Sequence, residues 1–149
     1  MGDRAQASIE FVLVIAFGMV ILLPASLIFA NYSRESSEEL KMTQLIRMGN
    51  DIVLQSENVY YYSDPSRVEI IGVVPEGVKS IYVQTDWANH VNLLTFNLQK
   101  GDKIQPVTFF SRVNMNGTFE ARDFTPGRKR ILLEVKRKGN EPYVDIDFK

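Results

Sequence analysis

The 149-residue sequence contains no cysteine and only one histidine, His90. Without cysteine the chain forms no disulfides, thiolate metal sites or iron–sulfur clusters, and it has no cysteine nucleophile. A single histidine excludes metal sites built from several imidazoles. The charges nearly cancel, since 17 Lys and Arg face 18 Asp and Glu, which argues against a protein that binds nucleic acid by neutralising phosphates. We therefore expect no cofactor and no nucleic-acid partner.

Catalytic motifs are missing as well. The sequence has no serine–histidine–acid set, no glycine-rich phosphate loop and no dinucleotide fingerprint. Three carboxylates, Glu134, Asp145 and Asp147, could hold a hard cation such as calcium. Calcium-loop spacing is absent, and we expect these carboxylates to pair with Lys136 and Arg130 instead. The sequence therefore predicts neither an enzyme nor a metal site.

One apolar run without any charge covers residues 11–30. As a helix this run is about 30 Å long, which is the thickness of the hydrocarbon core of a bilayer. A helix buried in a small soluble domain would show a polar face, and this run has none. It predicts a helix that spans a membrane or lies buried in a bundle. Gly18 would permit close approach of a neighbouring helix, and Pro24 would loosen the helix locally.

A carboxylate, Glu10, borders the apolar run on its N-terminal side. At the edge of a bilayer helix such a group is costly unless it gains a partner, which makes Glu10 a candidate functional residue. The alternative is that Glu10 sits in the headgroup zone. An ordinary secretory signal fits poorly, because the run exceeds the usual length of about 7–15 residues. Cleavage after Ala30 would also put Ile28 where a small residue is expected.

The residues before the run form a short motif: Arg4-Ala5, then Gln6, Ser8 and Glu10 in the spacing Gln-x-Ser-x-Glu. Together with the apolar helix, this motif resembles the class III signal peptide of archaeal type IV prepilins. The resemblance is strongest over residues 4–30. It implies that a prepilin peptidase cuts between Ala5 and Gln6. Glycine most often precedes the cut in the family, and Ala5 departs from this while remaining small.

The resemblance implies a structural filament subunit. The precursor would lie in the cytoplasmic membrane as a single-span protein surrounded by lipid, and membrane assembly machinery would polymerise it with identical or related pilin subunits into a helical cell-surface filament. Cleavage creates a new amino group at Gln6, and the family mechanism pairs Glu10 with this group in an adjacent subunit. A buried charge left without its partner would cost about 3–5 kcal/mol. Glu10, Gly18 and Pro24 are therefore the expected assembly residues.

Two other interpretations stay open. The chain could be a single-span membrane-anchored surface protein with a β-rich binding ectodomain that never polymerises. It could also be a minor pilin-like subunit that caps or primes a filament. A simple anchor needs neither Gln6 nor Glu10, so these residues separate the first alternative from a pilin. Adhesion, DNA uptake and motility are not distinguished by the sequence.

Mixed polar composition begins at residue 31. Small or apolar residues recur at three- and four-residue steps, as expected for one face of an amphipathic helix: Met42, Leu45, Ile46, Gly49, Ile52, Val53 and Ser56. Neither a proline nor a turn cluster separates this segment from the apolar run. We therefore predict one continuous helix from about residue 7 to about residue 60, about 80 Å long. Residues 63–66 are expected to end it.

The C-terminal part is rich in β-branched and aromatic residues between turn clusters, including one at 86–89. We predict strands near 67–74, 79–86, 91–99, 105–113, 117–121, 129–137 and 142–148. The last two form the clearest hairpin, in which a Gly139-Asn140 turn places Lys138 opposite Glu141 and Val135 opposite Val144.

The expected fold class is therefore α+β, with a long N-terminal helix packed on a C-terminal antiparallel sheet or small β-sandwich. The corresponding division of the chain is a cleaved leader (1–5), an apolar membrane-spanning or filament-core helix (6–30), its amphipathic continuation (31–64) and a β-rich head (65–149).

Two Asn-x-Ser/Thr acceptors suggest a glycoprotein. Asn116 falls in a predicted exposed turn, whereas Asn31 falls at the end of the apolar helix, where a glycan would crowd a packed bundle. Charge is also uneven: residues 31–64 hold six acids and three bases, and residues 126–149 hold seven bases and four acids. This asymmetry could orient neighbouring subunits, or it could reflect solvated faces of a helix and a hairpin.

Overall fold

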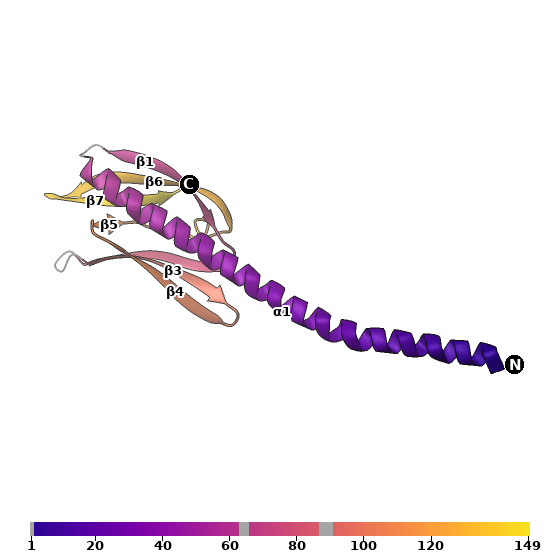
Figure 1. The fold of residues 1–149 in the computed structure, drawn as a ribbon. Coiled ribbons are helices and arrows are strands. Elements are labelled where there is room, and N and C mark those ends of the chain that lie inside the picture. The colour runs from indigo at the N-terminus through magenta and orange to yellow at the C-terminus, as the bar shows by residue number, and fades with distance from the viewer. Residues whose placement is uncertain (1, 63–65, 87–90) are drawn as a thin grey trace. The chain divides into compact units, whose positions relative to one another are not determined.

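The structure, a computed structural model, describes the backbone of residues 2–62, 66–86 and 91–149, and the side chains of these ranges from Ile9 onward. It has an α+β fold, as expected, with a long helix followed by strands (Figure 1). The elements are α1 (Gly2–Tyr61), β1 (Arg67–Val74), β2 (Val78–Asp86), β3 (Val91–Lys100), β4 (Lys103–Ser111), β5 (Met115–Asn116), β6 (Gly127–Lys138) and β7 (Glu141–Phe148).

The chain divides into two compact units, residues Met1–Glu39 and Leu40–Lys149. The boundary between the units falls inside α1, between Glu39 and Leu40. It lies nine residues after the boundary expected from the change of composition, which is between residues 30 and 31. The helix from Leu40 onward therefore belongs to the same folded unit as the strands. Three expected features lie outside the described residues: the turn residues 63–65, the turn residues 87–89, and His90.

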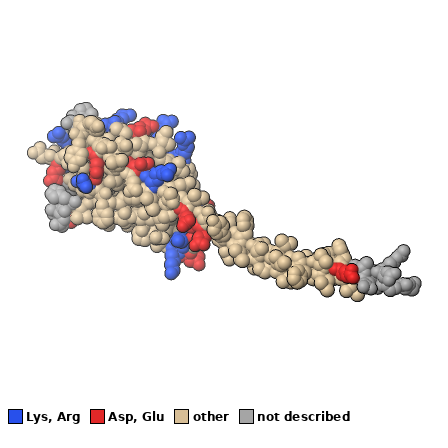
Figure 2. All heavy atoms as spheres, viewed as in Figure 1, with Lys and Arg blue, Asp and Glu red and all other residues tan. Residues whose placement is uncertain are grey.

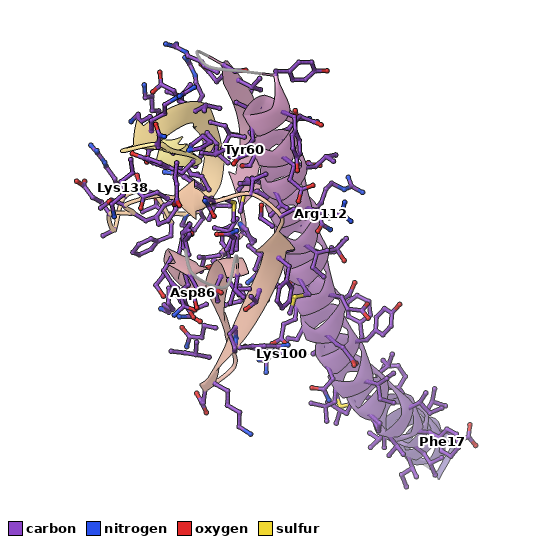
Figure 3. The ribbon with its side chains drawn as sticks, turned by 90° about the vertical axis from the view of Figure 1, so that its left-hand side faces the viewer. Phe17, Tyr60, Asp86, Lys100, Arg112 and Lys138 are labelled. Carbon is purple, nitrogen blue, oxygen red and sulfur yellow. The ribbon has the colours of Figure 1, made fainter. Side chains whose placement is uncertain are left out.

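The first unit is a helix whose apolar side chains are exposed on all sides. From Ile9 to Phe29, the large hydrophobic side chains are 45–72% exposed. By length and composition this helix can cross a membrane, and none of its apolar span is buried inside the chain. Figure 2 shows an uninterrupted uncharged surface along this stretch, and Figure 3 shows Phe17 among the side chains that surround the helix.

In the second unit, α1 buries one stripe of side chains. Leu45, Ile52 and Val59 are completely buried and Met48 is nearly so. Their three- and four-residue spacing is that of one helix face. The expectation that Ile46 belongs to this stripe is wrong, because Ile46 is 42% exposed. A helix turns about 100° per residue, so Ile46 lies beyond the edge of the stripe that includes Leu45.

A glycine brings α1 close to β4. An added Cβ at Gly49 would lie 2.3 Å from two ring carbons of Phe109. The Phe109 ring meets Phe96 edge to face, with centroids 5.9 Å apart. An added Cβ at Gly72 of β1 would likewise lie 2.9 Å from the sulfur of Met48. Both close contacts therefore depend on the absence of a side chain.

The strands form two sheets, with the orders β1-β6-β7-β5 and β2-β3-β4. All pairs are antiparallel except β5 with β7. The predicted hairpin register is confirmed, with Lys138 opposite Glu141 and Val135 opposite Val144. Its turn contains Gly139 at φ 66°, a left-handed conformation that glycine adopts without strain.

The strand predicted at 117–121 is absent, and the short β5 precedes its place. In this loop the Asp123 carboxylate accepts a hydrogen bond from the backbone N–H of Glu120 at 2.7 Å. The N–H of Asp123 donates to the Glu120 carbonyl at 2.9 Å. Such local bonds form a turn that competes with strand pairing. Phe119 packs edge to face on Phe148, with centroids 5.5 Å apart, which accounts for its strand-like hydrophobic position.

The helix and both sheets share one hydrophobic core within the second unit. Tyr60, labelled in Figure 3, packs against this core near the end of α1. The core's completely buried members include Leu45 and Ile52 of α1, Leu94 and Phe96 of β3 in one sheet, and Ile131 and Leu133 of β6 in the other.

Candidate assembly surface

Glu10 lies at the N-terminal edge of the exposed apolar helix, and its side chain is exposed. Residues 11–33 carry no charge, so the next charged residue along α1 is Arg34. At about 1.5 Å per residue, Arg34 is about 36 Å away along the helix axis, which is too far for an ion pair. A cationic partner for Glu10 must therefore come from the residues that precede it or from outside the first unit.

The other motif residues lie in the first turns of α1. The backbone of Arg4, Ala5, Gln6 and Ser8 is helical. Their side chains lie outside the described part of the structure. The expected cleavage bond between Ala5 and Gln6 is inside the helix, so cutting it would shorten α1 and leave the apolar run intact.

Gly18 leaves a flat position on the apolar helix. A Cβ added there would meet nothing within 4 Å. Small residues of this kind let the backbones of two helices approach closely. The open space at Gly18 is therefore available to a second helix, in contrast to Gly49, whose space is filled by the chain itself.

Pro24 lies inside α1, and the helix continues through it. Because proline has no N–H, the carbonyl of Val20 loses its usual partner. Nearby, the hydroxyl of Ser26 bonds back to the preceding turn of the helix. It lies 2.9 Å from the carbonyl oxygens of both Leu22 and Leu23. The apolar run thus contains a local break in its hydrogen-bond ladder.

The two candidate glycosylation residues are both exposed. Asn116 belongs to β5 and not to the predicted turn, because it pairs with Asp145 of β7. Its Nδ2 lies 3.5 Å from Oδ1 of that aspartate. Thr118, the third residue of this acceptor, is also exposed. Asn31 lies within α1 in the first unit.

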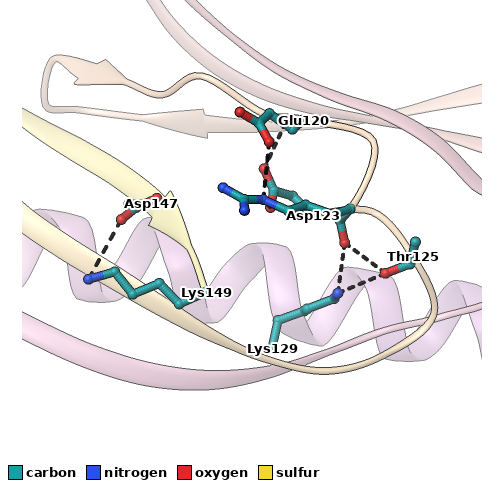
Figure 4. A network of polar contacts seen from close by, with 7 residues as sticks. Glu120, Asp123, Thr125, Lys129, Asp147 and Lys149 are labelled. Carbon is teal, nitrogen blue, oxygen red and sulfur yellow. Dashed lines mark hydrogen bonds and ion pairs between the residues drawn. The ribbon is translucent and has the colours of Figure 1, made fainter.

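The carboxylates considered for a metal are held by lysines. Lys136 Nζ lies 2.5 Å from Asp145 Oδ2 and 3.8 Å from Glu134 Oε2. The hydrogen bond to Asp145 holds the pKa of Lys136 above its ordinary value of 10.5. Asp147 pairs with Lys149 at 3.8 Å (Figure 4). Among the described residues, no group of three or more acidic or histidine side chains is arranged to hold a metal ion.

Arg130 does not take part in this cluster, contrary to expectation. It pairs with Glu69 of the neighbouring strand at 3.8 Å. The cause is the strand order, which puts β1 beside β6 and brings Ile71 opposite Arg130 and Val73 opposite Arg128. These four residues, Ile71, Val73, Arg128 and Arg130, form a basic–apolar patch. The sequence shows the two arginines as part of a basic cluster, but not the apolar neighbours that β1 places beside them.

A groove of about 640 Å³ lies between α1 and β4 in the second unit. Leu54 and Phe110, which are 55% and 76% exposed, line it. At one end the backbone N–H of Arg112 donates to Glu57 Oε1 at 2.9 Å, and Figure 3 shows Arg112 beside α1. The groove offers apolar contact area to a partner side chain.

Comparison with protein-family models, with curated proteins and with solved structures finds no match to the chain.

Proposed function

We propose that the chain is the structural subunit of an archaeal type IV-like pilus. In this proposal it enters the cytoplasmic membrane as a single-span prepilin, a prepilin peptidase cleaves it before Gln6, and assembly machinery polymerises it through α1 into an extracellular filament. The proposal rests on the resemblance of the motif around Gln6 and Glu10 to class III signal peptides. The β-rich head would face the outside of the filament.

The observation that carries the proposal is the exposure of the apolar helix. Its large hydrophobic side chains from Ile9 to Phe29 are at least 45% exposed and have no partner surface in their own unit. Exposed apolar surface costs about 25 cal/mol per Å² relative to burial, so this helix requires lipid or other helices around it. A pilin uses both in succession: lipid before assembly and neighbouring subunits afterwards.

Glu10 distinguishes a filament subunit from a simple membrane anchor. A carboxylate at the membrane edge contributes nothing to anchoring and opposes insertion. In a bundle of helices it would pair with the amino group that cleavage creates at Gln6 of an adjacent subunit. Each subunit would then be held at one fixed height relative to its neighbour, because a slip would leave both charges buried and unpaired.

The test is deletion of the gene in the source organism, followed by electron microscopy of surface filaments. The proposal predicts that one class of filament disappears, that wild-type protein restores it, and that this chain is its main component by mass spectrometry. Unchanged filaments, with the chain found only in the membrane fraction, would instead support the single-span surface protein. If the deletion removes the filaments but wild-type filaments contain the chain only in trace amounts, the result would support a minor pilin-like subunit.

A further inference from the structure

The basic–apolar patch has the composition of a binding surface. Ile71 is 63% exposed and Val73 is 44% exposed, and each stands directly opposite an arginine on the same face of the sheet. The intervening residue, Gly72, is buried and faces the other way, since a Cβ added there would lie 2.9 Å from the sulfur of Met48 in α1. The patch therefore lies on the side of the sheet that is turned away from the helix of its own unit.

The charges of the patch are only weakly compensated. Arg130 pairs with Glu69 at 3.8 Å, and both side chains are about half exposed or more, so the pair contributes little. Arg128 forms no ion pair with any residue that the structure describes. Lys129 points elsewhere, since its Nζ donates to the Arg122 carbonyl and the Thr125 hydroxyl (Figure 4). Two guanidinium groups thus flank two exposed apolar side chains.

A complementary surface lies in the first unit, just after the apolar run. Tyr32, Glu35 and Glu39 are exposed and follow one another at three- and four-residue steps, which places them on one face of α1. Tyr32 is 69% exposed. We call these three residues the acidic helix face. It combines an aromatic side chain with two carboxylates, whereas the patch combines two aliphatic side chains with two guanidinium groups.

The spacings of the opposite charges also agree. Glu35 and Glu39 are four residues apart on a helix, a rise of about 6 Å. Arg128 and Arg130 are two residues apart on a strand, a separation of about 6.6 Å. Both carboxylates can therefore meet both guanidinium groups at the same time when the helix lies along β6. Arginine also matches carboxylates better than lysine does, because its planar group donates two parallel hydrogen bonds.

We propose that the basic–apolar patch of one subunit binds the acidic helix face of a neighbouring subunit. This inference rests on the proposed filament function and names one of its side contacts. The patch faces away from the helix of its own unit and is therefore open to a partner, and a filament supplies a second copy as that partner. An anionic lipid surface would also suit arginine and aliphatic groups. Glu35 and Glu39, however, follow the apolar run within ten residues and would repel such a surface.

A charge exchange tests the contact. Replacing Arg128 and Arg130 by Glu should reduce the yield of sheared filaments at least about tenfold, because like charges then face each other at every contact. Replacing Glu35 and Glu39 by Arg should do the same, and combining the four changes should restore assembly. The matched control replaces Arg67 and Lys103, both exposed and outside the patch, by Glu; it changes the net charge equally and should leave the yield unchanged.

The absence of cysteine permits a direct test of proximity in the same filaments. Cysteines introduced together at positions 35 and 128 should cross-link subunits into a ladder on mild oxidation, whereas each cysteine alone should not. Cross-linking confined to single chains would overturn the inference, because the two faces would then meet within one subunit. Normal yield after the Arg128 and Arg130 change would also overturn it, as would failure of the four-residue exchange to restore assembly.

Two further outcomes separate this inference from its alternatives. If the full chain carrying Arg128→Cys is reconstituted in vesicles, a water-soluble maleimide should label it equally with neutral and with anionic lipid. Protection by anionic lipid alone would show that the patch binds lipid, and the inference would be wrong. If the wild-type chain enters no filament at all, the proposed function fails. If the wild-type chain forms normal filaments and the charge variants form them equally well, only the contact is rejected and the proposed function stands.

Discussion

Glu10→Gln is the substitution that separates assembly from membrane insertion. It keeps the shape of the side chain and removes its charge, so helix length and packing stay nearly the same. No charged residue lies between Glu10 and Arg34, so no other carboxylate on this stretch of α1 can replace it. In a filament, the amino group at Gln6 of a neighbour would then stay buried without its counter-charge.

The expected size of the effect follows from this loss. Removing one partner of a buried ion pair costs about 3–5 kcal/mol. At about 1.4 kcal/mol per factor of ten, subunit association should weaken at least about a hundredfold. Insertion should improve slightly, because a neutral amide is easier to place at the membrane edge. Cleavage before Gln6 should continue, because the substituted residue is separated along the chain from the scissile bond between Ala5 and Gln6.

The assay compares processed subunit in the membrane with subunit in sheared filaments, for the wild type and the variant. Glu141→Gln is the matched control, since it removes an equal charge at an exposed position of the last hairpin. We expect the control to assemble normally and Glu10→Gln to accumulate in the membrane in processed form. A normal filament yield from Glu10→Gln would show that Glu10 is only an interfacial residue, and the pairing argument would be refuted.

The remaining predictions concern Gly49 and Gly18 of α1 and the head. Gly49→Ala should lower the melting temperature by a few degrees, because the cost of overpacking on Phe109, about 1–3 kcal/mol, exceeds the gain of about 1 kcal/mol in helix propensity; a higher melting temperature would contradict the close contact. Gly18→Ala should leave insertion unchanged and reduce filament yield, since its Cβ meets only a second helix; normal filaments would exclude such a contact. A fragment that begins at Asn31 should be soluble, monomeric and cooperatively folded by calorimetry, because the core lies within residues 40–149; broad melting with dye-accessible apolar surface would show that the head needs the rest of the chain.

Local patterns predicted those parts of the fold that depend on neighbours in sequence. The three- and four-residue spacing of Leu45, Gly49, Ile52 and Ser56 predicted the buried helix face. Strict alternation around the Gly139-Asn140 turn predicted the register of β6 with β7, because a shift by one residue would have exposed every buried side chain of that hairpin. The loop after β5 was predicted wrongly, since the bond from Glu120 to the Asp123 carboxylate is a turn signal that alternation does not reveal.

The basic–apolar patch could not be predicted from the sequence. It exists because β1 pairs with β6, although most of the head separates them along the chain. Hydrophobic alternation shows which face of each strand is buried and leaves open which strands are neighbours. Ile71 opposite Arg130 is therefore a consequence of strand order. The candidate residues Gln6, Glu10, Gly18 and Pro24, in contrast, follow one another within a single helix, so their relative positions were already determined by the sequence.

The N-terminus of the chain in purified surface filaments tests the central claim most directly. Mass spectrometry of the subunit in sheared filaments should find Gln6 as the first residue, with residues 1–5 missing. This result requires both the cleavage and the polymerisation that the account joins together. A subunit that begins at Met1, Gly2 or Asn31, or filaments that lack the chain, would contradict the account.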